Sequence, residues 1–162
     1  MRALIDRGLN DAGRFFGEAQ EEAKKSSCLR RKCGSVIVKG GLIIGRGFNS
    51  PPGNLENQRI CTIDKDSLDE KVTDKTCCIH AEQRAIIDAI DSVGREVVSG
   101  SVIYFTSVDQ QGNRLNSGEP YCTLCSKLAL DVEIVEWVLE RDEGFVVYNS
   151  QEYNNLSFNY KS

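Results

Sequence analysis

Apolar side chains recur every three or four residues in the segment 11–25, a spacing typical of an amphipathic helix. Asp11 could cap this helix, and the charged side chains of Glu21, Glu22 and Lys24 are expected to face away from the apolar stripe. We interpret the segment as a packing helix that carries no chemistry of its own. The stripe consists of Ala12, Phe15, Phe16, Ala19 and Ala23.

Two β-branched runs follow, at residues 35–38 and 42–45, with two glycines between them. A two-glycine turn flanked by such runs predicts a β-hairpin. The Pro-Pro-Gly sequence at 51–53 then forces a loop. Residues 54–77 are polar and charged without a repeating apolar pattern, which predicts a long loop of a kind that is usually functional or mobile.

The second half of the chain alternates between helical and β-strand patterns. Apolar side chains at helical spacing predict helices, and runs rich in β-branched and aromatic residues predict strands. The tail from 153 to 160 matches neither pattern. A hairpin followed by such an alternation predicts an α/β sandwich around one mixed sheet. In order, the expected elements are a helix 80–93, a strand 101–106, a loop 109–120, a helix 122–131, and strands 133–139 and 145–148.

Composition is that of an ordinary globular protein. A chain of 162 residues with 40% hydrophobic and 27% charged residues predicts a single domain, 1–162, that can bury a proper core. The net charge of −4 and the pI near 5.1 argue against a nucleic-acid partner, which needs a basic face.

The distribution of apolar residues argues against a membrane partner. No apolar run reaches the roughly 18 residues of a membrane span, and the first residues lack the apolar core of a signal peptide. We therefore expect a cytoplasmic location, where thiols stay reduced. Seven cysteines are an odd number for a disulfide framework, so metal binding is the better use for some of them.

The one histidine of the chain and a later pair of cysteines carry the chemistry. His80 and Glu82 lie at the start of one predicted helix, and Cys122 and Cys125 lie at the start of the next. One imidazole and two thiolates are the ligand count of a catalytic zinc, which keeps its fourth position for water. Helix N-termini also favour the thiolate forms. The alternative is a core histidine with two buried free cysteines.

Glu82 is expected to carry protons at this zinc. Zinc lowers the pKa of a bound water toward about 7, and a carboxylate that is not a ligand can pass the proton to a ring nitrogen and then to a leaving amine. This is the chemistry of hydrolytic deamination. Residues two apart do not face the same way inside a regular helix, so His80 must lie at an irregular first turn.

Five segments of the chain together resemble the zinc-dependent cytidine/deoxycytidylate deaminase superfamily, in its His-Ala-Glu, deoxycytidylate deaminase-like branch. The resemblance covers roughly residues 28–148. His-Ala-Glu or Cys-x-x-Cys alone would be a weak signal, but both appear here with a strand between them. The segments are 34–38, 45–49, 80–86, 104–106 and 122–125.

The resemblance implies an enzyme, a zinc-dependent hydrolase acting on amidine C–N bonds. It implies that His80, Cys122 and Cys125 hold the zinc and that Glu82 is the catalytic proton shuttle. The first candidate reaction is the conversion of deoxycytidylate to deoxyuridylate and ammonia. Alternatives are deamination of another base (cytosine, guanine or tRNA adenosine) and a non-catalytic zinc-binding module with this fold.

The resemblance also implies a fold and a substrate site. The fold is a three-layer α-β-α sandwich around a five-stranded mixed sheet, commonly assembled as a homo-oligomer. Asn49 and the backbone N–H of Ala81 are expected to bind the small nucleotide or nucleoside substrate. The alternative role for Asn49 is that of an ordinary turn residue.

Several residues depart from the family pattern or stay unassigned. The insertion 109–120 and Tyr121 are additions that we expect at the rim of the pocket, where they would alter substrate choice. Some phage-type deoxycytidylate deaminases carry a second, structural metal, and the remaining cysteines could form a mostly thiolate site or be plain buried thiols. These are Cys28, Cys33, Cys61, Cys77 and Cys78. Candidate cations for a substrate phosphate are Arg30, Lys32, Arg46 and Arg114.

Overall fold

The computed structural model of the chain describes residues 1–3 and 7–161. Within these residues one sheet of seven strands runs in the order β1-β7-β6-β4-β2-β3, and β5 pairs with β4. Strands β4 and β6 are parallel and the other pairs are antiparallel, so the predicted mixed sheet is confirmed. The strands are β1 (Arg2–Ala3), β2 (Lys32–Lys39), β3 (Leu42–Phe48), β4 (Val102–Val108), β5 (Arg114–Leu115), β6 (Glu136–Arg141) and β7 (Gly144–Asn149).

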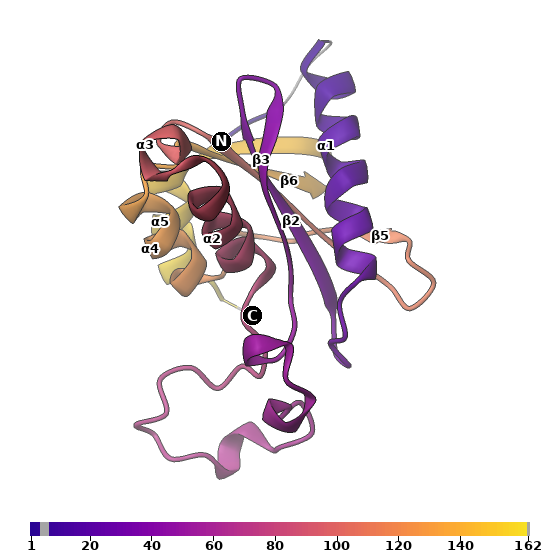
Figure 1. The fold of residues 1–162 in the computed structure, drawn as a ribbon, viewed down its shortest axis with the longest axis vertical. Coiled ribbons are helices and arrows are strands. Elements are labelled where there is room, and N and C mark those ends of the chain that lie inside the picture. Colours follow the sequence, from indigo (N-terminus) through magenta and orange to yellow (C-terminus); the bar gives the residue numbers. More distant parts are fainter. Residues whose placement is uncertain (4–6, 162) are drawn as a thin grey trace.

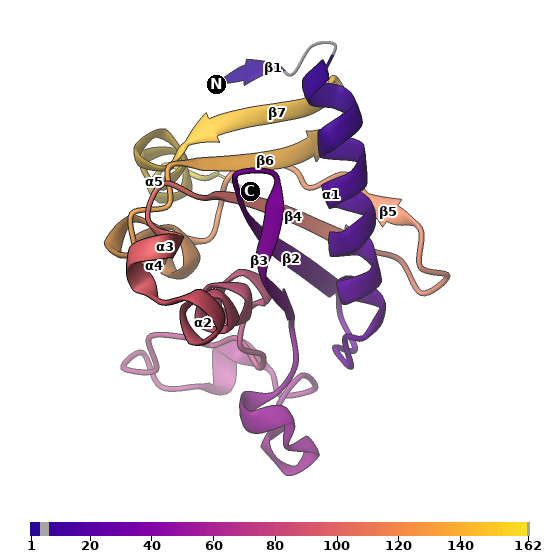
Figure 2. The same cartoon turned by 45° about the horizontal axis from the view of Figure 1, so that its top comes forward.

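Helices cover both faces of the sheet, as the predicted three-layer sandwich requires. Helix α1 lies alone on one face, and the other α-helices lie on the opposite face (Figures 1 and 2). Side chains of β4 alternate between them, since Tyr104 packs on Phe15 of α1 while Ile103 and Phe105 join the opposite cluster. The helices are α1 (Arg7–Lys24), α2 (Ala81–Val93), α3 (Arg95–Val98), α4 (Thr123–Asp131) and α5 (Ser150–Phe158).

The predicted count of five strands is wrong, because two strands of two residues each extend the sheet. Strand β1 pairs with β7 at the sheet edge. Strand β5 pairs with the last residues of β4, Ser107 and Val108, beyond the point where the pairing of β4 with β6 ends at Phe105. Strands this short show no apolar periodicity, so the sequence could not indicate them.

Helix α1 buries the predicted stripe of five apolar side chains. The helix is longer than predicted: Asp11 lies inside it and does not cap it. The prediction that Glu22 faces away is also wrong. Its carboxylate is buried, accepts a hydrogen bond from Lys25 Nζ at 2.7 Å, and lies 3.6 Å from Arg46.

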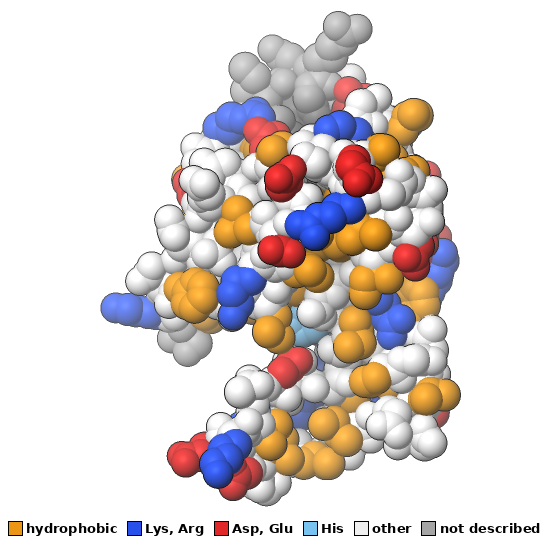
Figure 3. All heavy atoms as spheres, turned by 60° about the vertical axis from the view of Figure 1, so that its left-hand side comes forward, with side chains coloured by type: hydrophobic (Ala, Val, Ile, Leu, Met, Phe, Trp, Pro, Cys, Tyr) orange, Lys and Arg blue, Asp and Glu red, His pale blue; other side chains and the backbone are white. Residues whose placement is uncertain are grey.

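Residues 54–78, here called the outer segment, project from the end of the sheet without an α-helix or strand (Figure 1). The long loop predicted at 54–77 is therefore confirmed, with short 3₁₀ turns at η1 (Pro52–Asn54), η2 (Glu56–Gln58) and η3 (Lys65–Ser67). Figure 3 shows a hollow between the outer segment and the body of the molecule.

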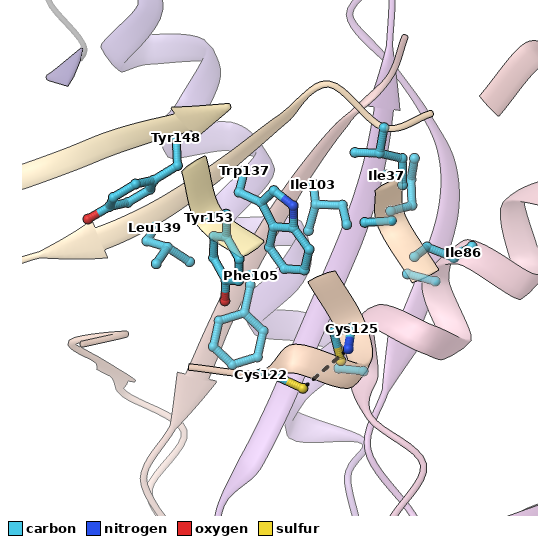
Figure 4. Packing of buried hydrophobic residues seen from close by; sticks show 14 of the residues in the cluster. Ile37, Ile86, Ile103, Phe105, Cys122, Cys125, Trp137, Leu139, Tyr148 and Tyr153 are labelled. Carbon is cyan, nitrogen blue, oxygen red and sulfur yellow. Dashed lines mark hydrogen bonds between the residues drawn. The ribbon is translucent and has the colours of Figure 1, made fainter. Parts of the chain in front are cut away.

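The chain's tail forms α5, an element that the sequence pattern does not indicate. Asn149 caps it by accepting a hydrogen bond from the Glu152 backbone N–H at 2.8 Å. Tyr153 stacks on Trp137 with ring centroids 4.0 Å apart (Figure 4). The buried side of this helix otherwise carries serines, which is why no apolar stripe appears in the sequence.

Two glycines of β3 allow α2 to approach the sheet with its backbone. A Cβ on Gly47 would lie 2.2 Å from the carbonyl oxygen of Ala81 and 2.4 Å from the amide nitrogen of Ala85. A Cβ on Gly45 would lie 2.3 Å from the carbonyl oxygen of Ala85. Any other residue at these positions would push the start of α2 away from the strand.

We predict that Gly47→Ala destabilises the fold by ~3 kcal/mol, because overpacking against backbone cannot be relieved by a rotamer change. Gly13→Ala is the matched control. Gly13 lies inside α1 with open space around its Cβ position, so alanine there should stabilise the protein by up to ~1 kcal/mol. Urea denaturation measures both changes, and equal stabilities of the two variants would contradict the close packing of α2 on β3.

Candidate metal centre and active site

His80 lies immediately before the first residue of α2. Its backbone is extended (φ −72°, ψ 153°) and its N–H donates to Gln83 Oε1 at 3.0 Å. The preceding residue, Ile79, donates its N–H to the Ser50 carbonyl at 3.0 Å. His80 therefore has the irregular position that the sequence argument required, and its ring is free to point away from the helix axis.

Cys122 holds the same position at the start of α4. Its Sγ accepts a hydrogen bond from the Cys125 backbone N–H at 3.4 Å (Figure 4). Both sulfurs lie 3.2 Å from His80 Nδ1. The structure thus brings the three predicted ligand groups together, with all three ligand atoms within 4.8 Å of one another.

The chemistry of this donor set fits zinc. Hydrogen bonding with the Cys125 side chain and then with His80 lowers the pKa of Cys122 to about 4, against the opposing effect of burial. The pKa of Cys125 is raised well above its usual value, first by the bond to Cys122 and then by burial. Two buried sulfurs this close repel each other if both are thiolates. A bound divalent cation compensates both negative charges, so that both cysteines can be deprotonated.

Glu82 lies beside these groups without joining them. Its side chain is buried, with 4% of its surface exposed, and it lines the same cavity as His80. It is not a member of the cluster of potential ligands. Burial, and then the charge of Cys122, raise the pKa of Glu82 to about 7, so the carboxylate can take up and release a proton near neutral pH.

A cavity of about 260 Å³ opens in front of His80 and Glu82. Figure 3 shows the histidine at the inner end of the hollow, between the outer segment and the body. Phe105 of the sheet and Tyr121, just before α4, form part of its wall. Such an apolar cavity with a few convergent polar groups is the usual form of a small-molecule site.

Asn49 and Ala81, the predicted substrate contacts, both line this cavity. The amide of Asn49 already has partners in the chain: its Oδ1 accepts from the Cys33 N–H at 2.8 Å and from Ser26 Oγ at 2.6 Å, and its Nδ2 donates to the Arg31 carbonyl at 2.9 Å. One N–H of the amide is left for a ligand. The Ala81 N–H is at the first turn of α2, where backbone donors have no intrahelical partner.

The insertion 109–120 does not contribute to the lining of the cavity, although Tyr121 does. Because β5 pairs with the end of β4, the tip of the insertion reaches α1, where Gln20 Nε2 donates to the Gly112 carbonyl at 2.8 Å. Residues 116–119 border a separate depression that shares Arg31 and Tyr121 with the cavity.

Of the four candidate phosphate cations, only Arg30 lines the cavity. Arg46 pairs with Glu18 on α1, and Arg114 pairs with Glu140 on β6. Sequence reasoning missed Lys65 and Lys75, which line the cavity from the outer segment. The mixed-charge composition of that segment gave no sign that these two lysines face inward.

Three further sulfurs gather at the base of the outer segment. Cys28, Cys61 and Cys78 are buried, and their Sγ atoms lie within 4.8 Å of one another, so they could hold a metal ion. Cys77 lies close by and its Sγ accepts the Ile60 N–H at 3.1 Å. The unassigned cysteines thus separate into this group and Cys33.

Proteins of similar sequence carry names that fit a zinc-binding deaminase site. The chain is similar to the deoxycytidylate deaminases of Schizosaccharomyces pombe, with 29% identity over 142 residues, and of Saccharomyces cerevisiae, with 29% identity over 141 residues. Each alignment includes 86% of this chain but only 38% and 37% of the relative, so the chain spans well under half the length of these relatives.

The fold is similar to that of a cyanophage S-TIM5 dCMP deaminase crystal structure, with a TM-score of 0.57 and 20% identity over 82% of each chain. No helix among residues 1–3 and 7–161 has the length and apolar character to cross a bilayer. The family described as "Cytidine and deoxycytidylate deaminase zinc-binding region" matches residues 9–141. The chain therefore belongs to the zinc-binding cytidine and deoxycytidylate deaminase family.

Proposed function

We propose that this protein is a zinc-dependent deaminase that hydrolyses deoxycytidylate to deoxyuridylate and ammonia. One observation carries the proposal: an imidazole and two sulfurs converge at two helix starts, and the buried Glu82 carboxylate faces the same cavity without joining them. A purely structural zinc site has no use for such a carboxylate, and it would be closed by four protein ligands.

His80, Cys122 and Cys125 would hold the zinc. The chemistry that zinc supplies, when bound, is Lewis acidity, which lets water attack as hydroxide near neutral pH. Two of these ligand residues, His80 and Cys122, stand directly before helices, so the rigid elements α2 and α4 fix their positions. Preformed ligands of this kind need little rearrangement to bind the ion.

Glu82 would move the protons of the reaction. Its carboxylate takes a proton from the attacking water and gives it to the ring nitrogen next to the amine-bearing carbon. Glu82 then takes the second proton of the former water from the new hydroxyl group and gives it to the amine. The C–N bond breaks, the amine leaves as ammonia, and the water oxygen stays on the ring as a carbonyl. General acid–base help of this kind is worth about 10²–10⁴-fold in rate.

Substrate orientation would come from the cavity wall. The Ala81 N–H can donate to the ring carbonyl, and the remaining N–H of Asn49 can donate to the sugar or base. Phe105 and Tyr121 supply apolar surface for the ring. Two relatives that carry the name deoxycytidylate deaminase support a cytosine nucleotide as the substrate over another base.

The remaining expectations about the whole protein stay predictions. They are a single domain over 1–162, a homo-oligomeric assembly, a cytoplasmic location, and the absence of a nucleic-acid partner.

We predict that Glu82→Gln lowers turnover of deoxycytidylate by about 10²–10⁴-fold, because the amide keeps the shape of the side chain but cannot carry a proton. Ammonia release from deoxycytidylate, deoxycytidine, cytidylate, cytosine and guanine is the measurement. Glu96→Gln, on the exposed surface of α3, should retain full activity. Wild-type protein that releases no ammonia from any of the five would show a non-catalytic zinc module instead.

Metal analysis provides an independent test. We predict that Cys122→Ser binds one zinc ion fewer per chain than the wild type, since a neutral hydroxyl is a poor zinc ligand. Cys33→Ser is the control, because Cys33 is a buried cysteine that belongs to neither sulfur group. The result is read as a difference, since Cys28, Cys61 and Cys78 could hold an ion of their own. Unchanged zinc content in Cys122→Ser would contradict the assigned ligands.

A further inference from the structure

The side-chain amide of Asn49 has only one orientation that satisfies its neighbours. Its Oδ1 lies 2.8 Å from the Cys33 backbone N–H, which can only donate, and its Nδ2 lies 2.9 Å from the Arg31 carbonyl, which can only accept. Exchanging the oxygen and the nitrogen of the amide would bring two donors together at Cys33 and two acceptors together at Arg31. The group that remains for a ligand in the cavity is therefore an N–H, so Asn49 offers a hydrogen-bond donor.

Ser26 supplies a further hydrogen bond to Asn49 from outside the cavity. It is buried, with 4% of its surface exposed, and it is not a lining residue. Its Oγ lies 2.6 Å from Asn49 Oδ1 and 2.7 Å from the Asn49 backbone carbonyl oxygen. Both oxygens can only accept, and Ser26 Oγ itself accepts the Cys28 N–H at 3.1 Å. The hydroxyl proton of Ser26 is therefore donated to Asn49.

The end of helix α1 fixes the position of this hydroxyl. The Ser26 N–H donates to the Ala23 carbonyl at 3.0 Å, so Ser26 belongs to the turn that ends the helix. A Cβ on Gly34 of β2 would collide with backbone atoms of Ala19 and Ala23. Because backbone lies against backbone here, the end of α1 cannot shift along β2 without a collision.

Ser26 thus holds Asn49 from a second element of the fold. The Arg31 and Cys33 groups both come from the beginning of β2 and the residue before it, whereas Ser26 comes from the end of α1. A polar side chain held from two sides is already ordered before the ligand arrives, which lowers the cost of binding.

We infer that Ser26 is a positioning residue, whose hydroxyl holds the Asn49 amide so that an N–H remains for an acceptor oxygen of the substrate. This inference rests on the proposed function, in which Asn49 binds the substrate. It also gives α1 a part in the site, although the sequence indicated only a packing helix.

The kinetic test compares Ser26→Ala with the matched control Ser35→Ala in the zinc-loaded full chain. Ser35 is also buried, but its Oγ donates to the Tyr104 carbonyl of β4 at 3.0 Å. Ser26→Ala should lower kcat/KM for deoxycytidylate about 3- to 10-fold, the usual effect of losing an uncharged hydrogen bond. Ser35→Ala should leave kcat/KM unchanged, and an equal loss in both variants would overturn the inference.

A double-mutant cycle shows whether Ser26 acts through Asn49. In the Asn49→Ala background, Ser26→Ala should change kcat/KM by less than about twofold, because the amide on which the hydroxyl acts is absent. The hydroxyl can still donate to the backbone carbonyl of residue 49 there. If Ser26→Ala lowers kcat/KM by the same factor in both backgrounds, Ser26 does not act through the amide and the inference is wrong.

Hydrogen exchange of the Asn49 amide keeps the inference separate from the deaminase proposal. In protein labelled with ¹⁵N-asparagine, the side-chain NH₂ signal that is absent from Asn49→Ala belongs to Asn49. Its protons should exchange with water severalfold faster in Ser26→Ala than in the wild type, and at the wild-type rate in Ser35→Ala. If the wild type turns over no nucleotide, the deaminase proposal fails, and this measurement, which needs no substrate, still decides the role of Ser26.

Ser26→Cys replaces Ser26→Ala in these measurements if urea denaturation shows that the alanine variant does not fold. Cysteine fills the buried space, but its thiol is a weak donor. Faster exchange of the Asn49 amide and a lower kcat/KM are expected again. Wild-type exchange in a folded Ser26 variant overturns the inference.

Discussion

The contact between α2 and β3 is the constraint on which the candidate site depends. At Gly45 and Gly47 the strand comes so close that helix backbone atoms occupy the space of a side chain. The helix cannot rotate or slide there without a collision between backbones, which interiors packed at crystal density do not tolerate. The extended His80 precedes this fixed helix, so the position of its imidazole follows from the position of two glycines.

The other half of the site depends on how α4 is supported. Ser126, next to Cys125, donates its hydroxyl to Asn154 Oδ1 of α5 at 2.8 Å. Helix α5 is in turn held by Tyr153, which stacks on Trp137 in the core (Figure 4). The tail that showed no clear sequence pattern is therefore part of the support for the sulfur ligands. Polar contacts give the tail this role, and because its buried side is mostly polar, apolar spacing in the sequence does not indicate a helix there.

Sequence reasoning succeeded where the chemistry is local. Local patterns place His80 and Cys122 at helix starts, and the ligand set together with the family resemblance predicts that they meet Cys125, as they do in the structure. It failed where the outcome depends on distant contacts. Nothing in the pattern around Glu22 shows that Arg46, from another element, makes its burial possible, and nothing around Lys75 shows that it faces a cavity.

The outer segment leaves and rejoins the body at one place, the bridge between Ser50 and Ile79. It is thus a long loop whose two ends are held together by backbone hydrogen bonding. The entropic cost of closing such a loop grows only with the logarithm of its length, by about 0.6 kcal/mol for each doubling. Insertions and deletions in this loop therefore cost little free energy. The outer wall of the cavity can change its length and composition in evolution while the sheet and the histidine-cysteine cluster remain as they are.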